Sequence, residues 1–397
     1  MRASRLALAL ALPALVAACG DDATAPAADT LAPADTVAAD TLAPADTLTA
    51  DTASTDTATA PDALPADTFV PDPNDPCDYA FDPQASYVTH LAVASLAEAT
   101  GADGKPADHC CFDQNSDGVT DNRLGEIVST LQGLPQITRK INEVIAANVA
   151  DGTITVLLEL VGLSNLTSVS GVTLNAFYGS DADGDATNNA TGASAFYVDA
   201  DSFTAGTAEP RVHFTDVTVT NGNLFAGPSV FRLEIPLANG LAVSADIRNA
   251  RVEGKIAAGP HGGVAVDGAT PDGAGGTYGA KLGGVIHQDD LFGAFNTFVD
   301  RFCACLAVPG GADVLVKSGD AWTCSSNVDK SSCDPNDEAQ AQCRTLVDVC
   351  GLALTLITPD IDSDSSGSPD AFSVGFWVKA TGAVLQDVNP TACTVTP

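Results

Sequence analysis

Three short stretches of the chain carry oxygen-bearing side chains at alternate positions, a spacing that lets one loop wrap a cation. Carboxylate and amide oxygens are the ligands that Ca²⁺ prefers, and a glycine at the sharp bend lets neighbouring ligands converge. Gly118 and Gly367 supply that bend in the first and third stretches, whereas the second has Ala186 there. We therefore predict structural calcium sites with these ligands: Asp113, Asn115, Asp117 and Asp121; Asp181, Asp183 and Asp185; Asp362, Asp364 and Asp370.

The first stretch, DQNSDGVTD, resembles the DxNxDG loops of dockerins and thrombospondin type 3 repeats. In EF-hand-like numbering, its side-chain ligands fall at positions 1, 3, 5 and 9, and the Val119 carbonyl falls at position 7. Position 12 is Leu124 in place of an acid, although Glu126 is close. The missing bidentate ligand predicts weak binding, with a dissociation constant of about 10⁻⁴ to 10⁻³ M. The alternative is an Asp- and Asn-rich turn that only caps the following helix.

The N-terminus has the pattern of an export signal. Two arginines precede an apolar run that ends at Leu15, which is shorter than the about 20 residues needed to span a bilayer. The small residues before Cys19 resemble the lipobox of bacterial lipoproteins, which implies removal of residues 1–18 and acylation of Cys19. In that family an Asp after the cysteine tends to retain the protein on the inner membrane, so Gly20 favours the outer membrane or cell surface. The alternative is an ordinary secretory signal in which Cys19 is coincidental.

A low-complexity segment follows the signal. Residues 19–76 consist almost wholly of Ala, Asp, Thr and Pro, and the octet DTLAPADT occurs at 29–36 and again at 40–47. A segment with so few large apolar side chains cannot bury enough surface to offset its chain entropy. We predict a disordered tether between the lipid anchor and a folded domain at residues 77–397.

The folded part contains ten cysteines, and an even number in an exported chain predicts disulfide bonds. Two of them, Cys343 and Cys350, lie seven residues apart in a predicted helix, which separates them by about 10 Å, beyond the roughly 7 Å limit for a disulfide. They are therefore predicted to fasten that helix to other elements. The predicted disulfide cysteines are Cys77, Cys110, Cys111, Cys303, Cys305, Cys324, Cys333, Cys343, Cys350 and Cys393.

Two further inferences concern the pairing of these cysteines. Cys324 and Cys333 bracket a short loop and are the best local pair. Cys110 and Cys111 are adjacent, and because a bond between neighbours would distort the intervening peptide, each is predicted to bond elsewhere. A zinc site at His109, Cys110 and Cys111 would lack a second pair of ligands, so it is not favoured.

The periodicity of apolar residues predicts an α+β fold that is mainly antiparallel β, either a β-sandwich or an open barrel, with a few packed helices. The helix that follows the first Asp stretch has Asp121 or Asn122 as its N-cap and is interrupted at Pro135. In the strand at 211–220 the apolar residues change from even to odd positions near Asp216, which indicates a bulge. Helices are predicted near 122–149, 289–304 and 336–351, and other strands at 153–163, 172–178, 194–200 and 372–380.

The segment VFRLEIPLANGLAVSADIR predicts a hairpin whose register can be derived. A two-residue turn at Asn239–Gly240 would set apolar side chains opposite polar ones. A three-residue loop at 238–240 makes every inward pair apolar and puts Gly240 at the left-handed position that such a loop requires. The strand ARVEGKIA is predicted to follow as the next strand of the meander. The predicted pairs are Leu237 with Leu241, Ile235 with Val243, Leu233 with Ala245, and Phe231 with Ile247.

The sequence carries no strong catalytic pattern. The sequence has no G-x-S-x-G, H-E-x-x-H, P-loop or dinucleotide-binding glycine motif, and its five histidines are scattered. Glu159 or Glu234 could serve a glycosidase, but nothing in their spacing selects a pair. The aromatic residues Trp322, Trp377 and Phe177 could line a sugar or peptide site, although core packing is the favoured interpretation.

The net charge of −34 argues against nucleic-acid binding, because phosphate backbones repel so acidic a chain. Together these patterns predict a lipoprotein of the outer membrane or cell surface, attached to the membrane by its lipid. It would present a calcium-stabilised, disulfide-bonded domain that binds a glycan or protein, or that has a structural role. The alternative is a secreted hydrolase whose carboxylates converge only in the fold.

Overall fold

A computed structural model describes residues 72, 74–94, 110–132, 141–192, 194–237, 241–272, 275–307, 313–319, 321–389 and 393. The predicted signal peptide, Cys19 and nearly all of the predicted tether lie outside these residues. Among the residues that are described, no helix has the length and apolar character needed to cross a bilayer.

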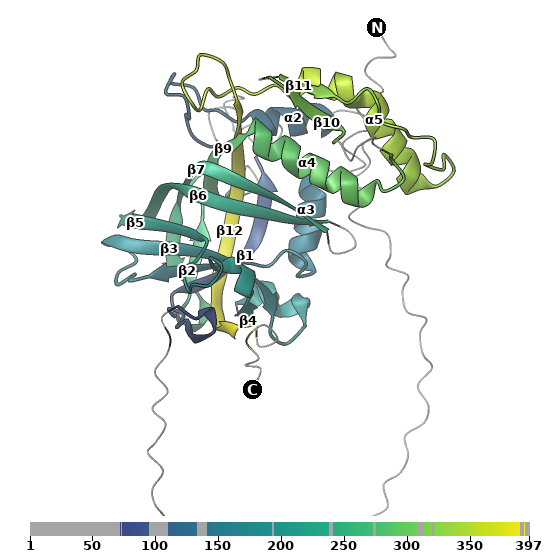
Figure 1. Ribbon diagram of the computed structural model, residues 1–397. Coiled ribbons are helices and arrows are strands. Elements are labelled where there is room, and N and C mark those ends of the chain that lie inside the picture. The colour runs from purple at the N-terminus through teal and green to yellow at the C-terminus, as the bar shows by residue number, and fades with distance from the viewer. Residues whose placement is uncertain are drawn as a thin grey trace, which may run out of the picture. The chain divides into compact units, whose positions relative to one another are not determined.

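Ten strands of the described chain form one sheet: β1 (Ala85–Val93), β2 (Val156–Val161), β3 (Ser168–Asp181), β4 (Ala195–Val198), β5 (Val212–Thr220), β6 (Asn223–Leu237), β7 (Leu241–Ala258), β8 (Val264–Asp267), β9 (Ala280–His287) and β12 (Ala371–Val388). Eight of them pair antiparallel in a closed ring, in the order β1, β2, β3, β5, β6, β7, β9, β12 and back to β1 (Figure 1). Outside this ring, β8 pairs with β7 and β12, and β4 runs parallel to β12. The prediction of a mainly antiparallel fold is therefore confirmed.

The hairpin of β6 and β7 has the predicted register. Leu237 pairs with Leu241, and the other three predicted pairs follow along the ladder. Of the inward residues whose burial is described, Phe231, Leu233, Ala245 and Ile247 are all buried. The loop at 238–240 lies outside the described residues. The prediction that ARVEGKIA forms a separate strand is wrong. This segment continues β7, which changes register near Asn249 (φ 51°).

The predicted bulge in β5 is confirmed. The pairing of β3 with β5 shifts between Val172–Val217 and Leu174–Phe214, and the intervening Asp216 has a φ of 57°. The shift moves the inward positions from even to odd numbers, so that Val212, Phe214, Val217 and Val219 all reach the core.

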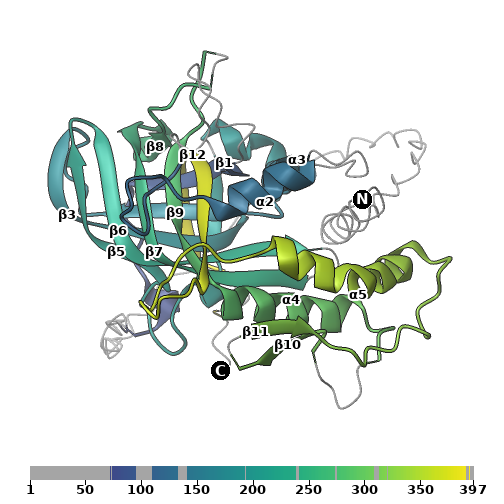
Figure 2. The ribbon, with the colours of Figure 1, turned by 90° about the horizontal axis from the view of Figure 1, so that it is seen from above.

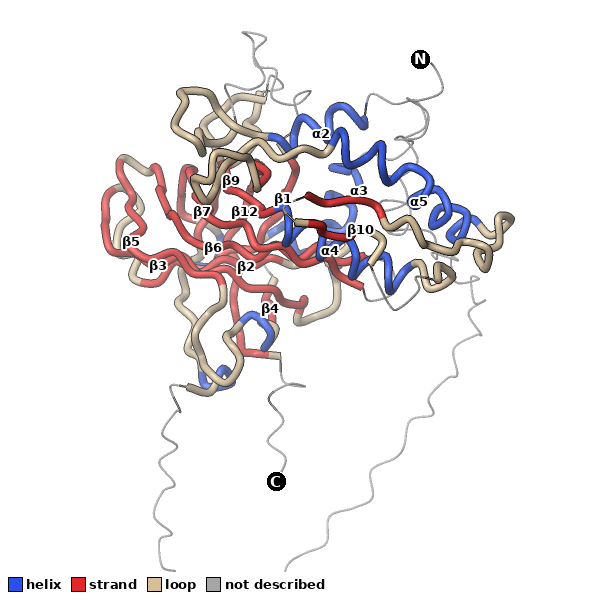
Figure 3. The backbone as a smooth tube through the Cα atoms, turned by 45° about the horizontal axis from the view of Figure 1, so that its top comes forward, coloured by secondary structure: helices blue, strands red, loops and turns tan. Residues whose placement is uncertain are grey.

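Four helices lie close to the predicted ranges: α2 (Arg123–Gln132), α3 (Ile141–Ala150), α4 (Gln288–Phe302) and α5 (Glu338–Leu356). Asn122, one of the two predicted caps, accepts a hydrogen bond from the Gly125 amide at 3.0 Å. A short hairpin of β10 (Leu315–Ser318) and β11 (Ala321–Cys324) was not predicted. Figure 2 shows α4, α5, β10 and β11 grouped together beside the ring, and Figure 3 shows the long helices gathered to one side of the strands.

Three disulfides hold this group together. Cys303–Cys343 and Cys324–Cys350 fasten α5 to the end of α4 and to β11, which confirms that Cys343 and Cys350 bond to other elements. The predicted pair of Cys324 and Cys333 is wrong, because Cys333 bonds to Cys305. After β11 the chain turns away to pair Asp329 with Ala307, which carries Cys333 to the end of α4.

The remaining four cysteines form two more bonds. Cys77 bonds to Cys393 and so joins the beginning of the folded chain to its end. Cys110 bonds to Cys111, so the prediction that each bonds elsewhere is wrong. Their shared peptide is cis, with the two α-carbons 2.9 Å apart, so the chain adopts the distorted peptide that it was predicted to avoid. Both cysteines are buried against Trp377.

The inside of the ring is a packed apolar core. Among the described residues, a wholly apolar cavity of about 40 Å³ lies between side chains such as Leu91, Phe214 and Leu282. For comparison, an engineered apolar cavity of about 150 Å³ binds benzene. Within the described part of the chain, the ring interior is therefore hydrophobic core.

Candidate metal sites

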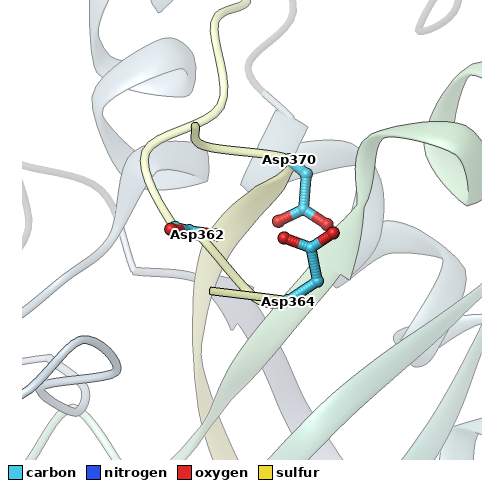
Figure 4. A group of neighbouring side chains, drawn as sticks. All are labelled: Asp362, Asp364 and Asp370. Carbon is cyan, nitrogen blue, oxygen red and sulfur yellow. The ribbon is translucent and has the colours of Figure 1, made fainter. Parts of the chain in front are cut away.

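The third predicted stretch forms a compact acidic loop between α5 and β12. Among the described residues, Asp362, Asp364 and Asp370 are the one group of metal-ligating side chains whose ligand atoms all lie within 4.8 Å of one another. Figure 4 shows the carboxylates of Asp364 and Asp370 turned toward each other. The predicted ligands of this stretch are therefore brought together.

Backbone amides fix the orientation of these carboxylates. Asp362 accepts hydrogen bonds from the amides of Ser366 (2.9 Å) and Gly367 (2.7 Å), four and five residues ahead. Asp364 accepts from the Ser366 amide at 2.9 Å. Asp370 accepts from both the amide (2.7 Å) and the hydroxyl (2.8 Å) of Ser363. Because Gly367 has a φ of 91°, the loop takes a left-handed turn at the position where the sequence predicted a sharp bend.

The first predicted stretch repeats this geometry at the equivalent positions. Asp113 accepts from the amides of Asp117 (3.2 Å) and Gly118 (2.9 Å), again four and five residues ahead. Asn115 accepts from the Asp117 amide at 2.9 Å, and Asp121 accepts from the Gln114 amide at 2.7 Å. Gly118 has a φ of 88°.

The two loops also share their backbone frame. The fourth residue is left-handed in both, with φ values of 64° at Ser116 and 60° at Ser365. The ninth residue donates its amide to the carbonyl just before the loop, Asp121 to Phe112 (3.0 Å) and Asp370 to Ile361 (2.9 Å). We call residues 113–121 and 362–370 the matched loops. Two segments far apart in the chain have thus adopted one conformation.

The matched loops have the chemistry to bind a hard cation. Each carboxylate has about four lone-pair sites, so accepting one or two amide hydrogen bonds leaves oxygen lone pairs free for a metal. Glu126, considered as a replacement for the missing ligand at position 12, instead forms an ion pair with Arg123 at 2.6 Å. The ion pairs of the described residues use other carboxylates than those of the matched loops.

The pKa values of two carboxylates in the matched loops are shifted in opposite directions. Burial raises the pKa of Asp121, two loop amides oppose the rise, and the charges of Asp360 and Asp117 add to it. Asp364 is exposed, and its hydrogen bonds from Ser366 lower its pKa. A bound cation would relieve the repulsion at Asp121 and would favour the ionised carboxylates.

The second predicted stretch does not form a matched loop. Asp181 accepts from the Asp183 amide (3.2 Å) and Asp183 from the Asp185 amide (2.8 Å) in successive turns. Asp185 caps a short 3-10 helix, η4 (Ala186–Thr191), through the Thr187 amide. Ala186 enters this helix where the matched loops have a left-handed glycine, so the chain does not fold back over Asp181.

The candidate catalytic residues are in structural positions. Glu159 is fully buried, and three donors surround its carboxylate. His213, one of the five scattered histidines, lies in β5, where its ring contacts the Pro210 carbonyl at 2.9 Å and lies 4.0 Å from the Glu209 carboxylate. Trp377 and Phe177 are each 1% exposed, which supports core packing rather than a binding surface. The side chain of Glu234 lies outside the described part.

Comparisons of the chain with protein-family models, with curated proteins and with solved structures find no match.

Proposed function

We propose that this chain is an envelope lipoprotein, anchored through Cys19, which presents a disulfide-bonded β-barrel domain stabilised by calcium in the two matched loops. The observation that carries the calcium proposal is the agreement between residues 113–121 and 362–370 in side-chain hydrogen bonds, left-handed positions and backbone closure. A turn that served only to cap a helix would be needed in the first loop alone, because α2 follows the first loop whereas a strand follows the second.

The position of the matched loops favours a structural role for the metal. The Arg123 amide, at the start of α2, donates to the Ser373 hydroxyl at 2.7 Å. The Ser373 amide donates in turn to Asp360, just before the second matched loop, at 2.9 Å. Calcium in either loop would therefore stabilise the junction between α2 and the closing strand β12.

Calcium is expected to stabilise the folded chain, and its removal by EDTA to destabilise it. With a dissociation constant of about 10⁻⁴ to 10⁻³ M, about 10 mM free calcium adds roughly 1.4–2.7 kcal/mol per site. Thermal unfolding of the full chain in calcium and in EDTA measures the effect. Asp121→Asn and Asp370→Asn each remove a charged ligand but keep an acceptor for the loop amide, so each is expected to lose the contribution of one loop.

The matched control for this experiment is Asp201→Asn, which changes an exposed aspartate away from the matched loops. This variant should be stabilised by calcium as much as the wild type is. If the Asp121→Asn/Asp370→Asn double variant were stabilised by calcium as strongly as the wild type, the matched loops would not be the sites. A wild type that melts identically in calcium and EDTA would refute the calcium proposal altogether.

The lipid anchor has its own test. In cells labelled with a fatty acid, the wild-type chain is expected to become labelled, whereas the Cys19→Ala variant should carry no label because the acceptor thiol is gone. Equal labelling of both would show that Cys19 is not the anchor. The control is Thr30→Ser in the predicted tether, which leaves Cys19 intact and should be labelled like the wild type.

For a partner, we propose a glycan or a protein at the cell surface, consistent with the acidic chain and its predicted export. An array of glycans and peptides probed with the purified chain, in calcium and in EDTA, tests this. The alternative of a hydrolase would require carboxylates with raised pKa in an open cleft. Burial does raise the pKa of Glu159, but its carboxylate has no exposed surface.

A further inference from the structure

The outer face of the ring carries a group of cations on the neighbouring strands β7, β9 and β12 (Figure 1). Successive side chains of a strand point to opposite faces, and on these strands Val252, Ile256, Leu282 and Val378 pack into the core. The residues that alternate with them therefore face outward. We call four of these outward residues the cationic strip: Arg251, Lys255, Lys281 and Lys379.

Strand pairing brings these four cations onto one patch of the sheet. In the ladder of β7 with β9, Lys281 lies opposite Glu253, the residue midway between the two cations of β7. Asp267 of β8 lies opposite Lys255 and forms an ion pair with Lys379 at 3.7 Å, which places it between these two cations. Since a strand rises about 3.3 Å per residue, the cationic strip extends roughly 13 Å along β7.

The cationic strip is poorly neutralised by the protein itself. Among the residues that the structure describes, Arg251 and Lys255 form no ion pair. The other two cations have only long ion pairs, 4.0 Å at Lys281 and 3.7 Å at Lys379, beyond the range of a direct hydrogen bond. The chain has 51 acidic and 17 basic residues, so carboxylates are abundant, and yet four cations here face only two of them. This local excess of positive charge on an acidic molecule points to an anion from outside.

A linear acidic glycan fits the charge and the shape of the cationic strip. Cations spread over roughly 13 Å suit a polymer with several anionic groups better than one small anion. Because charges more than about 8 Å apart are largely screened at physiological ionic strength, a single chain lying along the strip escapes most of the repulsion from the rest of the molecule. A flat anionic membrane, or DNA with one charge per about 1.7 Å of helix axis, would bring many anionic groups against the surrounding carboxylates.

We propose that the cationic strip binds a linear polysaccharide that carries carboxylate groups, a polyuronate. The guanidinium of Arg251 can hold a carboxylate through two parallel hydrogen bonds, whereas the lysines act as point charges. This inference rests on the glycan partner of the proposed function and specifies its chemistry. It requires neither calcium in the matched loops nor the lipid anchor.

Calorimetric titration of the purified full chain with polygalacturonate tests this proposal, with dextran as the neutral comparison and EDTA present throughout. The wild type is expected to bind polygalacturonate but not dextran, and to bind more weakly as salt is added. Arg251→Gln/Lys255→Gln should bind about tenfold more weakly at low salt and with a shallower salt dependence, because two cations are removed. The matched control is Arg301→Gln, which removes an exposed cation of α4 and should bind like the wild type.

Several outcomes would overturn the proposal. A wild type that does not bind polygalacturonate, or a double variant that binds it as tightly as the wild type, would show that the cationic strip is not a glycan site. Tighter binding of polyglutamate, or of vesicles that contain anionic lipid, would assign the strip to an acidic protein or to a membrane instead. If Arg251→Gln/Lys255→Gln does not fold, Lys281→Gln/Lys379→Gln replaces it with the same expected result.

The failure of this proposal can be distinguished from the failure of the proposed function. If polygalacturonate is not bound but the array yields a neutral glycan or a peptide, the cationic strip fails and the partner of the proposed function stands. If polygalacturonate is bound through the strip while calcium leaves the melting temperature unchanged, only the calcium proposal fails.

Discussion

A Cys77→Ser/Cys393→Ser double variant is expected to lose about 3–5 kcal/mol of the free energy of unfolding. The bond joins residues 316 positions apart, so it closes nearly the whole folded chain into one loop. In the chain-entropy account, a cross-link stabilises by restricting the unfolded chain, and the effect grows with the length of the closed loop. Denaturant unfolding under non-reducing conditions measures the difference.

The matched control is Cys324→Ser/Cys350→Ser, which removes a bond between residues only 26 positions apart. From the loop lengths alone, this second double variant should lose about 2 kcal/mol less than the first. Equal losses would show that local packing, and not restriction of the unfolded chain, sets the contribution of the Cys77–Cys393 bond. An unfolding free energy unchanged from wild type would contradict the prediction for Cys77 and Cys393 directly.

The elements that the sequence predicted well are those with a strong local pattern. The β6–β7 register follows from the requirement that apolar side chains share one face, which only one loop length satisfies. The bulge at Asp216 follows from the same alternation, because a slip in the pattern can stay on one face only if a residue is inserted. Asn122 as a cap follows from the short polar side chain just before an apolar helical repeat.

The features that could not be predicted from the sequence depend on contacts between residues that lie far apart in the chain. The ring closes because β12 pairs with β1, nearly 300 residues earlier, and no local pattern specifies that pairing. The bond of Cys324 to Cys350 depends on how the β10–β11 hairpin packs on α5, so proximity in the sequence was a misleading guide. For the candidate sites, the acidic spacing identified both matched loops.

The network around Glu159 is a second feature that only the fold reveals. Its carboxylate accepts hydrogen bonds from the Tyr79 hydroxyl (2.9 Å), the Asp82 amide (2.6 Å) and the Asn175 side chain (2.9 Å). Tyr79 and Asp82 belong to the segment before β1, which also carries Cys77. Glu159 therefore fastens to the ring the part of the domain where the predicted tether joins it.

Glu159→Leu is expected to destabilise the fold by about 3 kcal/mol. The substitution leaves the Tyr79 hydroxyl and the Asp82 amide without their acceptor, at about 1–3 kcal/mol each, whereas the Asn175 side chain still donates to the Tyr79 hydroxyl at 3.1 Å. The apolar side chain recovers part of that loss. Denaturant unfolding near neutral pH measures it, with Glu209→Leu as the control because its carboxylate is exposed. A loss no larger than that of the control would show that the network contributes nothing to stability.

Glu159→Gln should change the dependence of stability on pH. Burial is the main cause that raises the Glu159 pKa, and the hydrogen bonds from Asn175, Asp82 and Tyr79 only partly oppose it. A carboxyl whose folded pKa is raised binds its proton more tightly in the folded state. Its stabilising contribution is therefore complete below the ordinary glutamate value of about 4.3 and is lost as pH rises through the folded pKa.

In that window the wild type should lose stability relative to Glu159→Gln, which does not titrate, by up to about 1.4 kcal/mol per pH unit. At pH values above the folded pKa of Glu159, the difference in unfolding free energy between the two chains should become constant. The measurement is the free energy of unfolding of both chains at a series of pH values from acid to neutral. A wild type that instead gains stability relative to Glu159→Gln over this range would mean that the three hydrogen bonds outweigh burial, so that the buried glutamate is held as a carboxylate near neutral pH.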